Sequence, residues 1–334
     1  MMKAVLCKEY GGPENLVIED VTDLHPGKGQ VVIAVKSCGV NFPDALLVQN
    51  LYQFKPDLPF SPGGEVAGVV AEVGDGVTNV KVGDRVIGST GWGGMAEQVV
   101  VEAGRATPIP DEMPFDEASA FLMTYGTSHH ALKDRANIQP GESLLVLGAA
   151  GGVGLAAVEI GKVMGARVIA AASSEEKVQV ALDRGADDGF VYPHQPLDRD
   201  QQKELSKKIK ELAGGEGADV VYDPVGGDYC EPALRAIAWE GRFLIVGFPA
   251  GIAKIPMNLA LLKGCQIVGV FWGAFTGRNP EQNHANIAEL MAWYKEGKIK
   301  PFVSNRYDLE HAGDAIRELM DRKAKGKVVV TVSE

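Results

Sequence analysis

A glycine-rich turn near the middle of the chain is the segment best suited to hold a phosphate. Leu145 to Gly154 read LVLGAAGGVG, an apolar run, a glycine turn and the start of an apolar helical stretch. Glycines let a backbone approach a pyrophosphate, and the N–H groups and dipole at a helix start favour its negative charge. Ala149 stands where the pattern G-x-G-x-x-G has its first glycine, and a second strand follows on schedule. The segment therefore predicts a dinucleotide site, with a tight helix-strand crossing without a ligand as the alternative. The residues predicted to contact the cofactor here are Ala150, Gly151, Gly152, Val153 and Gly154.

The end of the next predicted strand bears on which dinucleotide binds. A preference for NAD would place Asp or Glu about 20 residues past the glycines, on the ribose 2′-hydroxyl. Here the strand ends in Ser173 and Ser174, followed by Lys177, which leaves room and a positive charge for a 2′-phosphate. Glu175 and Glu176 are the competing candidates, but Ser173 and Glu176 have the spacing of a helix capping box. The pattern therefore predicts NADP.

Strand-like and helix-like runs alternate beyond residue 140, which is typical of a parallel, doubly wound sheet. We expect strands at 144–147, 168–172, 189–191, 220–222, 243–246 and 267–271. The expected helices are 152–164, 175–184 and a charged surface helix at 203–212, with two more at 284–295 and 310–322 before a closing strand at 328–332.

The first hundred residues have a different pattern. Short β-rich runs at 4–7, 31–35, 66–73, 85–88 and 96–101 are closed by glycine turns and predict a mostly antiparallel β unit. A helical stretch within 111–137 links this unit to the alternating region. The chain of 334 residues is long enough for about two domains, so the fold class is α/β, with a β-rich unit and a doubly wound unit.

Composition excludes several classes of protein. Hydrophobic residues are 46% and charged residues 23%, as in soluble globular chains rather than disordered ones. The formal charge of -11 opposes binding to nucleic acid or anionic membranes. The longest uncharged stretch, 143–158, is too short and too glycine-rich to span a bilayer, and the first residues lack the apolar region of a signal peptide. We expect a cytoplasmic protein whose four scattered cysteines form neither disulfides nor a structural zinc site.

Six segments together resemble the medium-chain dehydrogenase/reductase superfamily, in particular its zinc-free NADPH:quinone oxidoreductase (ζ-crystallin-like) branch. They are Gly39-Val40-Asn41-Phe42-Pro43-Asp44, Pro62 to Gly68, Val82-Gly83-Asp84-Arg85-Val86, Thr124-Tyr125-Gly126-Thr127, the glycine turn, and Asp223-Pro224-Val225-Gly226-Gly227. The resemblance implies a discontinuous GroES-like catalytic domain over 1–124 and 275–334. It implies a Rossmann NADP-binding domain over 125–274, with the cofactor held between the two.

The resemblance also bears on metals. Zinc-dependent alcohol dehydrogenases of the superfamily have Gly-His-Glu where this chain has Gly63-Gly64-Glu65, and Cys where it has Asn41. Catalytic zinc needs about three protein ligands, so no metal is expected. Cys38 is interpreted as a buried apolar residue, and the adjacent His129 and His130 as structural, because neighbouring residues on a helix do not face one site.

Quinones and enones accept hydride directly, so the protein mainly holds the nicotinamide against the acceptor and excludes water. By resemblance, the active-site asparagine is Asn41, with Asp44 nearby, and Tyr52 is the active-site tyrosine, a phenol able to donate a proton to a developing enolate. A polar turn residue is the alternative for Asn41, and a half-buried loop aromatic the alternative for Tyr52.

The remaining cofactor contacts also come from the resemblance. Thr127 matches the threonine near the nicotinamide, with a helix N-cap as the alternative. Tyr192 matches a tyrosine on the 2′-phosphate, and Arg322 an arginine near the C-terminus, although the lysines beside it also fit a solvated charge run. Strand ends that face the crevice of a doubly wound sheet supply the others: Gly247, Phe248, Phe271, Trp272 and Gly273.

The expected function is an NADPH-dependent, metal-independent reductase of a small-molecule quinone or related conjugated carbonyl. An enoyl-thioester reductase of the same superfamily, with Tyr52 as proton donor, is the first alternative. The second is a crystallin-like structural protein that binds NADPH without turnover. Residues 266–271 resemble the dimer strand of the family, so we expect a homodimer; an unpaired apolar edge would otherwise invite aggregation.

Overall fold

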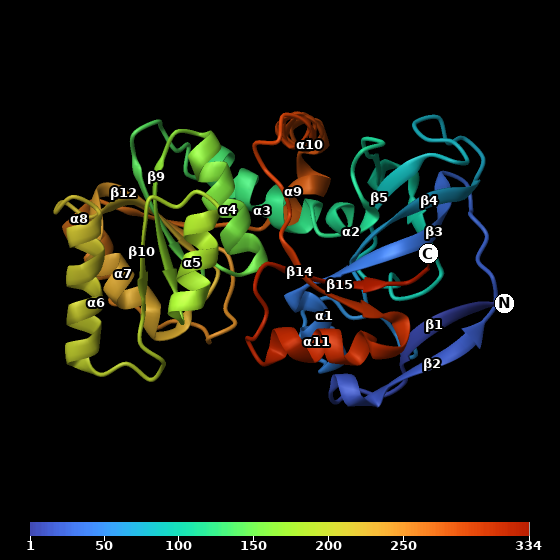
Figure 1. Ribbon diagram of the computed structural model, residues 1–334, viewed down its shortest axis with the longest axis horizontal. Coiled ribbons are helices and arrows are strands. Elements are labelled where there is room, and N and C mark those ends of the chain that lie inside the picture. Colours follow the sequence, from blue (N-terminus) through green and yellow to red (C-terminus); the bar gives the residue numbers. More distant parts are fainter. Residues whose placement is uncertain (334) are drawn as a thin grey trace. The chain divides into compact units, whose positions relative to one another are not determined.

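The second half of the chain folds around a six-stranded parallel sheet (Figure 1). Its strand order is β10-β9-β8-β11-β12-β13, and every neighbouring pair is parallel. In chain order the strands are β8 (Ser143–Leu147), β9 (Arg167–Ala172), β10 (Asp188–Val191), β11 (Ala218–Asp223), β12 (Ile237–Ile245) and β13 (Gln266–Gly269). This is the order 3-2-1-4-5-6 of a Rossmann sheet, whose switch point lies between β8 and β11. The expected doubly wound unit is confirmed.

Helices cover both faces of this sheet, with α4 and α5 on one side and α6 and α7 on the other (Figure 1). Their bounds are α4 (Gly152–Val163), α5 (Glu175–Asp183), α6 (Arg199–Leu212) and α7 (Cys230–Arg235), with the short 3₁₀ turn η5 (Gly227–Tyr229). The remaining helices of this part are α3 (Thr127–His129), α8 (Asn258–Lys263), α9 (Trp272–Arg278) and α10 (Pro280–Lys295). Strands β8 and β9 are almost wholly buried, as their continuous apolar sequences require.

The other unit is built on a seven-stranded sheet, in which six strands follow the order β14-β15-β3-β4-β5-β7 and the seventh, β6, pairs with β3. The strands are β3 (Gln30–Val40), β4 (Glu65–Val73), β5 (Arg85–Ser89), β6 (Gln98–Glu102), β7 (Ala106–Pro108), β14 (Val303–Asp308) and β15 (Lys327–Thr331). A separate hairpin pairs β1 (Met2–Cys7) with β2 (Leu16–Val21). All pairs are antiparallel except β14 with β15, so the predicted antiparallel β unit is confirmed.

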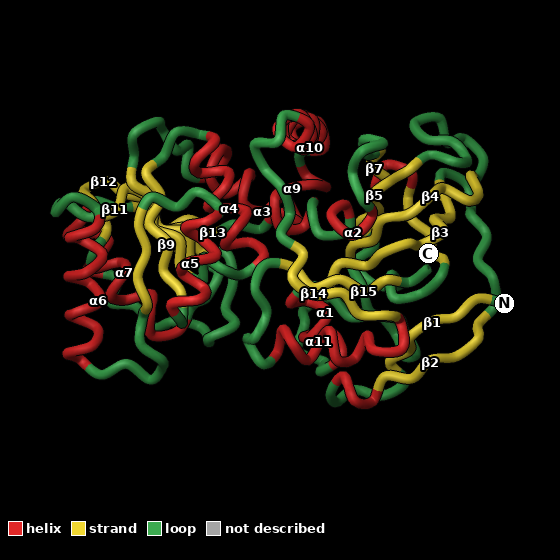
Figure 2. The backbone as a smooth tube through the Cα atoms, in the orientation of Figure 1, coloured by secondary structure: helices red, strands yellow, loops and turns green. Residues whose placement is uncertain are grey.

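Two helices, α1 (Phe42–Val48) and α11 (Ala312–Met320), pack against each other beside this sheet (Figure 2). The other short helices of this unit are α2 (Phe115–Ala118) and the 3₁₀ turns η1 (Pro13–Asn15), η2 (Ala103–Arg105) and η6 (Leu309–His311). Apolar residues from α1, α11 and strands β3, β4 and β15 share one buried core. That core fixes the start of α1, where the predicted catalytic residues lie.

The structure describes residues 1–333 and divides into two compact units, residues 1–123 with residues 300 onward, and Thr124–Ile299. The first division lies one residue from the expected 124/125. The second lies at 299/300, where the expected boundary was 274/275, because α10 packs within the second unit. In that helix Glu289 accepts from His129 at 2.8 Å, and Asn286 donates to Asp134 at 2.8 Å.

The stretch that leaves the first unit is helical in an unusual way. Two π-helical turns, η3 (Leu122–Gly126) and η4 (His130–Arg135), flank the single turn of α3. Insertions of this kind are frequent at functional sites. None of the helices within residues 1–333 combines the length and apolar character that crossing a bilayer requires.

Candidate functional site

The glycine turn between β8 and α4 has the geometry of a phosphate cradle. Gly148 takes a left-handed conformation (φ +60°), so the chain reverses one residue before the first position of the glycine pattern. A Cβ placed on Gly154 would lie 2.2 Å from the Gly148 carbonyl oxygen, which only glycine avoids. Gly151 is the N-cap of α4 and supplies no side-chain cap, so the first N–H groups of the helix are not bonded by a capping side chain. The cradle is therefore shaped for an anion.

At the end of β9, Ser174 rather than Ser173 caps the next helix. The Ser174 hydroxyl accepts from the backbone N–H of Lys177 at 3.3 Å. The predicted capping box of Ser173 and Glu176 is therefore wrong by one residue, because the chain stays extended through Ser174 (φ -155°, ψ 157°) before it turns. Ser173, Ser174 and Lys177 nevertheless follow directly on the carboxyl end of β9, beside the glycine turn that follows β8.

The other predicted cofactor residues of this unit also follow carboxyl ends of the sheet. Tyr192 follows β10, Gly247 and Phe248 follow β12, and the run from Phe271 to Gly273 follows β13. Parallel strands present these ends on one edge, where open α/β sheets bind ligands. Phe248 and Phe271 are about half exposed there, at 48% and 50%. The fold therefore brings these predicted cofactor residues to the carboxyl edge of the sheet.

Gly126, the residue before Thr127, packs against the ring of Trp272. A Cβ on Gly126 would lie 2.7 Å from the indole of Trp272, so the helix that carries Thr127 packs directly on that ring. Gly126 is itself helical (φ -61°, ψ -45°), which places Thr127 inside a continuous helical stretch. The N-cap alternative for Thr127 is therefore wrong.

Arg322 belongs to the first unit, directly after α11. It adopts φ +56°, a left-handed conformation that side chains disfavour. The Arg322 N–H donates to Leu319 O at 3.0 Å and the Lys323 N–H to Glu318 O at 3.2 Å, the pattern of a Schellman motif. Glycine usually occupies this position, so an arginine here is kept at a conformational cost.

Strand register brings Asn41 to the centre of a buried cluster. In the sheet, β3 pairs with β4 so that Gly39 faces Glu65, and with β15 so that Val40 faces Val328. Asn41 follows the end of β3, and Lys327 precedes Val328 on β15. Five residues on these neighbouring elements form what we call the Asn41 cluster: Cys38, Asn41, Asp44, Glu65 and Lys327. Each is at most 7% exposed.

Hydrogen bonds hold the Asn41 side chain on both sides. Lys327 Nζ donates to Asn41 Oδ1 at 2.5 Å and to Val40 O at 2.9 Å. Asn41 Nδ2 donates to Glu65 Oε2 at 3.3 Å and to Gly39 O at 3.2 Å. The Asn41 amide is therefore hydrogen-bonded at both ends within the first unit. The bonds from its amino group, at 3.2 and 3.3 Å, are longer than the bond of 2.5 Å that its oxygen accepts.

Asp44 serves the backbone at the start of α1. Its carboxylate accepts from the N–H groups of Asn41 at 2.8 Å and Gly63 at 3.1 Å. Burial is the main cause that raises the pKa of Asp44, to about 6, while these backbone hydrogen bonds oppose the rise. The geometry gives Asp44 a positioning role for the Asn41 segment.

Burial shapes the ionisation of the whole cluster. It raises the pKa of Glu65 and lowers that of Lys327, although the attraction between the two opposes both changes. Burial also raises the pKa of the Cys38 thiol, so Cys38 stays a neutral, apolar-like group, as predicted.

Tyr52 is half-buried against the core of the first unit, with the Phe54 ring 6.2 Å away in an edge-on arrangement. Burial, and then the nearby charge of Asp44, raise the pKa of its phenol above the usual 10. A phenol in this state keeps its proton at neutral pH and can still donate it. Leu51 and Phe54 on the same loop are 67% and 56% exposed, so the loop presents apolar surface next to Tyr52.

Glu65 and Lys327 are the members of the site that sequence reasoning did not assign. Glu65 belongs to the Gly63-Gly64-Glu65 segment, and the available signal was a charged residue at the start of an apolar strand. Lys327 was one lysine among several near Arg322, and nothing local marks it as the buried one. Its partner Asn41 lies 286 residues away in the sequence.

Within residues 1–333, no three His, Cys, Asp or Glu side chains are placed together so that they could hold a metal ion. His129 and His130 turn to different partners, His129 Nε2 to Glu289 at 2.8 Å and His130 Nδ1 to Asp134 at 2.7 Å. Their structural interpretation is confirmed.

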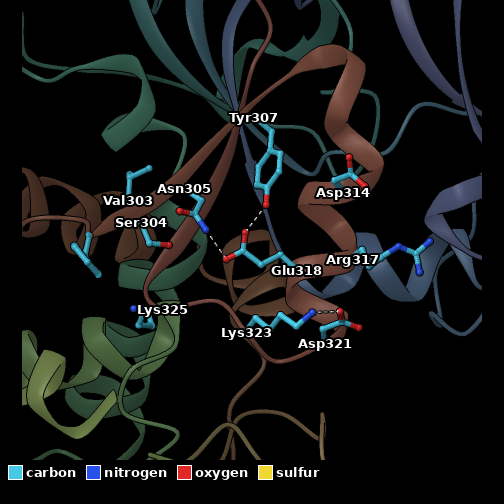
Figure 3. Close-up of a pocket in the computed structure, with 11 residues that line it drawn as sticks. Val303, Ser304, Asn305, Tyr307, Asp314, Arg317, Glu318, Asp321, Lys323 and Lys325 are labelled. Atoms are coloured by element: carbon cyan, nitrogen blue, oxygen red, sulfur yellow. Dashed lines mark hydrogen bonds and ion pairs between the residues drawn. The ribbon is translucent and has the colours of Figure 1, made fainter. Parts of the chain in front are cut away.

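A surface groove of about 580 Å³ lies between β14 and α11 (Figure 3). Glu318 accepts there from Asn305 and Tyr307, each at 2.8 Å, and Lys323 donates to Asp321 at 2.8 Å. None of the predicted site residues lines this groove, although Asp321 and Lys323, on either side of Arg322, do.

Comparison with known proteins agrees with both units. Residues 27–111 match the alcohol dehydrogenase GroES-like domain, and residues 152–294 match the zinc-binding dehydrogenase family. The quinone oxidoreductase-like protein 2 homolog of Nematostella vectensis is 40% identical over 99% of this chain and 89% of its own length.

Two solved structures extend the likeness. Mycobacterial Rv1454c complexed with NADPH has a TM-score of 0.91 and 31% identity, and covers 99% of this chain and 100% of its own. Escherichia coli quinone oxidoreductase complexed with NADPH has a TM-score of 0.89 and 28% identity over the same shares. With two matching domains and whole-length relatives, this chain belongs to the zinc-free NADPH:quinone oxidoreductase branch of the medium-chain dehydrogenase/reductase superfamily.

Proposed function

We propose that this protein is an NADPH-dependent reductase that transfers hydride to a quinone or a related conjugated carbonyl. The observation that carries the proposal is the carboxyl edge of the Rossmann sheet. An uncapped α4 start and the Gly154 cradle lie there next to Ser173, Ser174 and Lys177. Quinone oxidoreductase relatives, and neighbours solved with NADPH, support the same choice.

The residues present fit this cofactor. The first N–H groups of α4 can bind the pyrophosphate, because Gly151 leaves them without a side-chain cap. Lys177 supplies a positive charge for a 2′-phosphate, and Ser173 and Ser174 bring hydroxyl groups to the strand end where NAD-specific sites place Asp or Glu. Bound NADPH supplies the hydride. Trp272, on its helix start beside Gly126, and Thr127 would flank the nicotinamide.

The first unit supplies the proton and the hydrogen bond that reduction of a carbonyl requires. As hydride reaches the acceptor, negative charge develops on its oxygen, which a hydrogen-bond donor stabilises. The Asn41 amino group is the proposed donor, since its present bonds of 3.2 and 3.3 Å are long and readily exchanged. Tyr52 then gives its phenolic proton to the oxygen or enolate carbon, and solvent restores it.

The test follows NADPH absorbance with a simple quinone and with a crotonyl-type thioester side by side, with NADH in place of NADPH as the control. Rapid oxidation by the quinone with NADPH only supports the proposal. Preference for the thioester, with a larger loss for Tyr52→Phe on that substrate, makes the protein an enoyl-thioester reductase. Tight NADPH binding without turnover on either acceptor contradicts catalysis and leaves the crystallin-like alternative.

We also propose that the protein is a homodimer joined through residues 266–271. Strand β13 is the last in its sheet, so one of its edges has no strand partner among residues 1–333. Near it, Leu261 and Leu262 on α8 are 80% and 62% exposed, and Trp239 is 69% exposed. Paired edges would cover both features. Sedimentation velocity tests the proposal: a dimer is expected, with dissociation in Leu261→Asp/Leu262→Asp, whereas a monomeric wild type contradicts it.

A further inference from the structure

The Asn41 side chain has a partner beyond its own helix. Asn41 is the N-cap of α1 and forms a capping box with Asp44. The Asp44 N–H also donates to the backbone oxygen of Asn41, at 3.0 Å. The side-chain oxygen accepts in addition from Lys327 at 2.5 Å. A lysine from the far end of the chain therefore holds the amide oxygen at the start of α1.

The chemistry of its neighbours fixes which way this amide points. Lysine can only donate and an ionised carboxylate can only accept. Oδ1 must therefore face Lys327, and Nδ2 must face Glu65. The oxygen end is held by a short, charge-assisted bond, and the amino end by bonds of 3.2 and 3.3 Å.

The groups around the Lys327 ammonium show why it stays where it is. Glu65 and Asp44 provide negative charge, Val40 O accepts a second hydrogen bond at 2.9 Å, and the Cys38 thiol is close enough to interact with the ammonium. Lys327 itself is 5% exposed. A buried ammonium is costly unless other groups compensate its charge; this one donates to Asn41 Oδ1 and Val40 O and is attracted by the carboxylates of Glu65 and Asp44.

We infer that Lys327 is a positioning residue for the reduction, acting through Asn41. Its ammonium holds the amide oxygen and draws electron density from the amide, which strengthens Nδ2 as a donor to the acceptor oxygen. This inference rests on the proposed function, in which Asn41 is that donor. It assigns Lys327 no contact with NADPH or the acceptor.

The experiment is a double-mutant cycle on quinone reduction. Lys327→Met keeps the length of the side chain and removes the charge, Lys327→Arg keeps the charge, and Asn41→Ala removes the amide. For each protein and for Lys327→Met/Asn41→Ala, one measures kcat and KM for the quinone at saturating NADPH. The Kd of NADPH comes from fluorescence titration, and folding from thermal unfolding.

Lys327→Met is expected to lower kcat by about 10-fold or more, while the loss of a whole oxyanion donor costs about 100-fold or more. The Kd of NADPH should stay within about twofold, because the Lys327 contacts lie within the first unit. Lys327→Arg should recover part of the rate. In the Asn41→Ala background, Lys327→Met should cost less than about threefold further, since residues that act as one unit are not additive.

An unchanged kcat in Lys327→Met, or losses that multiply in the double variant, overturns the inference. Should Lys327→Met fail to fold, the same cycle is run with Lys327→Gln, which removes the charge but keeps a hydrogen-bond donor for the Asn41 oxygen. Wild-type protein that oxidises no NADPH with any quinone overturns the proposed function, and this inference with it. If the wild type reduces quinone and Lys327→Met has the same kcat, the inference alone is overturned and the proposed function stands.

Discussion

The backbone N–H of Met123 donates to Glu65 Oε1 at 2.8 Å, while the other oxygen of the same carboxylate accepts from Asn41. Met123 is the last residue of the first unit before the chain enters the second. One buried carboxylate thus holds both the end of that unit and the amide proposed to act in reduction.

Replacement of Glu65 by Gln should therefore be strongly destabilising. The change leaves the buried Lys327 ammonium with less opposing charge and weakens the hydrogen bonds from Met123 and Asn41. Hydrogen bonds to charged groups contribute about 1.5–3 kcal/mol each, and Glu65 is 1% exposed. Chemical denaturation measures the loss. The matched control is Glu72→Gln on the same strand, where the carboxylate is largely exposed and a change below about 0.5 kcal/mol is expected. Equal small losses in both variants would show that the Glu65 charge contributes little to stability.

The pH dependence of stability should carry a contribution from Asp44. Its native pKa of about 6 lies above the ordinary 3.8. Between these values the native state binds more protons than the unfolded one, so stability falls as the pH rises. At about 1.36 kcal/mol per pKa unit, the fall approaches roughly 3 kcal/mol. The unfolding free energy of wild type minus that of Asp44→Asn, measured from pH 4 to 7, should show this decline, and a flat difference contradicts it.

Adding one methyl group at Gly154 should abolish the phosphate cradle. The Cβ of Gly154→Ala would meet the Gly148 oxygen at 2.2 Å and push α4 away from the strand. Overpacking of this kind costs about 1–3 kcal/mol, and NADPH affinity should fall more than about 10-fold. In the control Gly277→Ala, the new Cβ meets nothing within 4 Å. Fluorescence titration that finds the same NADPH affinity in Gly154→Ala and wild type would place the pyrophosphate elsewhere.

Cofactor choice should change at Ser174 without loss of the helix cap. Asp caps a helix as well as Ser does, so Ser174→Asp keeps α5 while it adds a negative charge at the end of β9. Repulsion of the 2′-phosphate should weaken NADPH binding by about 10-fold, equivalent to 1.4 kcal/mol, and leave NADH binding unchanged or improved. Ser174→Thr serves as the neutral control. Equal losses for both cofactors would argue against a 2′-phosphate at this position.

The left-handed Arg322 offers a test that separates stability from binding. Arg322→Gly relieves a conformation that costs a side chain about 1–2 kcal/mol, so the thermal unfolding temperature should rise. If Arg322 contacts the cofactor, NADPH affinity should fall in the same variant. Asn137→Gly, at another left-handed position (φ +47°), should leave affinity unchanged. Stabilisation without any loss of affinity would remove Arg322 from the cofactor site.

Local patterns in the sequence determined most of the second unit. The glycine turn, the apolar strands β8 and β9, and Ser173 and Ser174 are consecutive features, so each strand is followed directly in sequence by the residues that it places at the sheet edge. The antiparallel character of the first unit followed in the same way from short β runs between glycine turns. Patterns of this kind depend on neighbours in sequence, which is why they can be read without coordinates.

Only the tertiary structure decided the contacts that depend on register. Lys327 reaches Asn41 because β15 pairs with β3 with Val328 opposite Val40, and no local property of a lysine near the C-terminus specifies that pairing. The domain division at 299/300 likewise depends on where α10 packs. A shift of one residue in a strand pair turns every side chain to the other face. The buried partners of Asn41 were therefore fixed by strand pairing across 286 residues of chain, beyond the reach of sequence pattern.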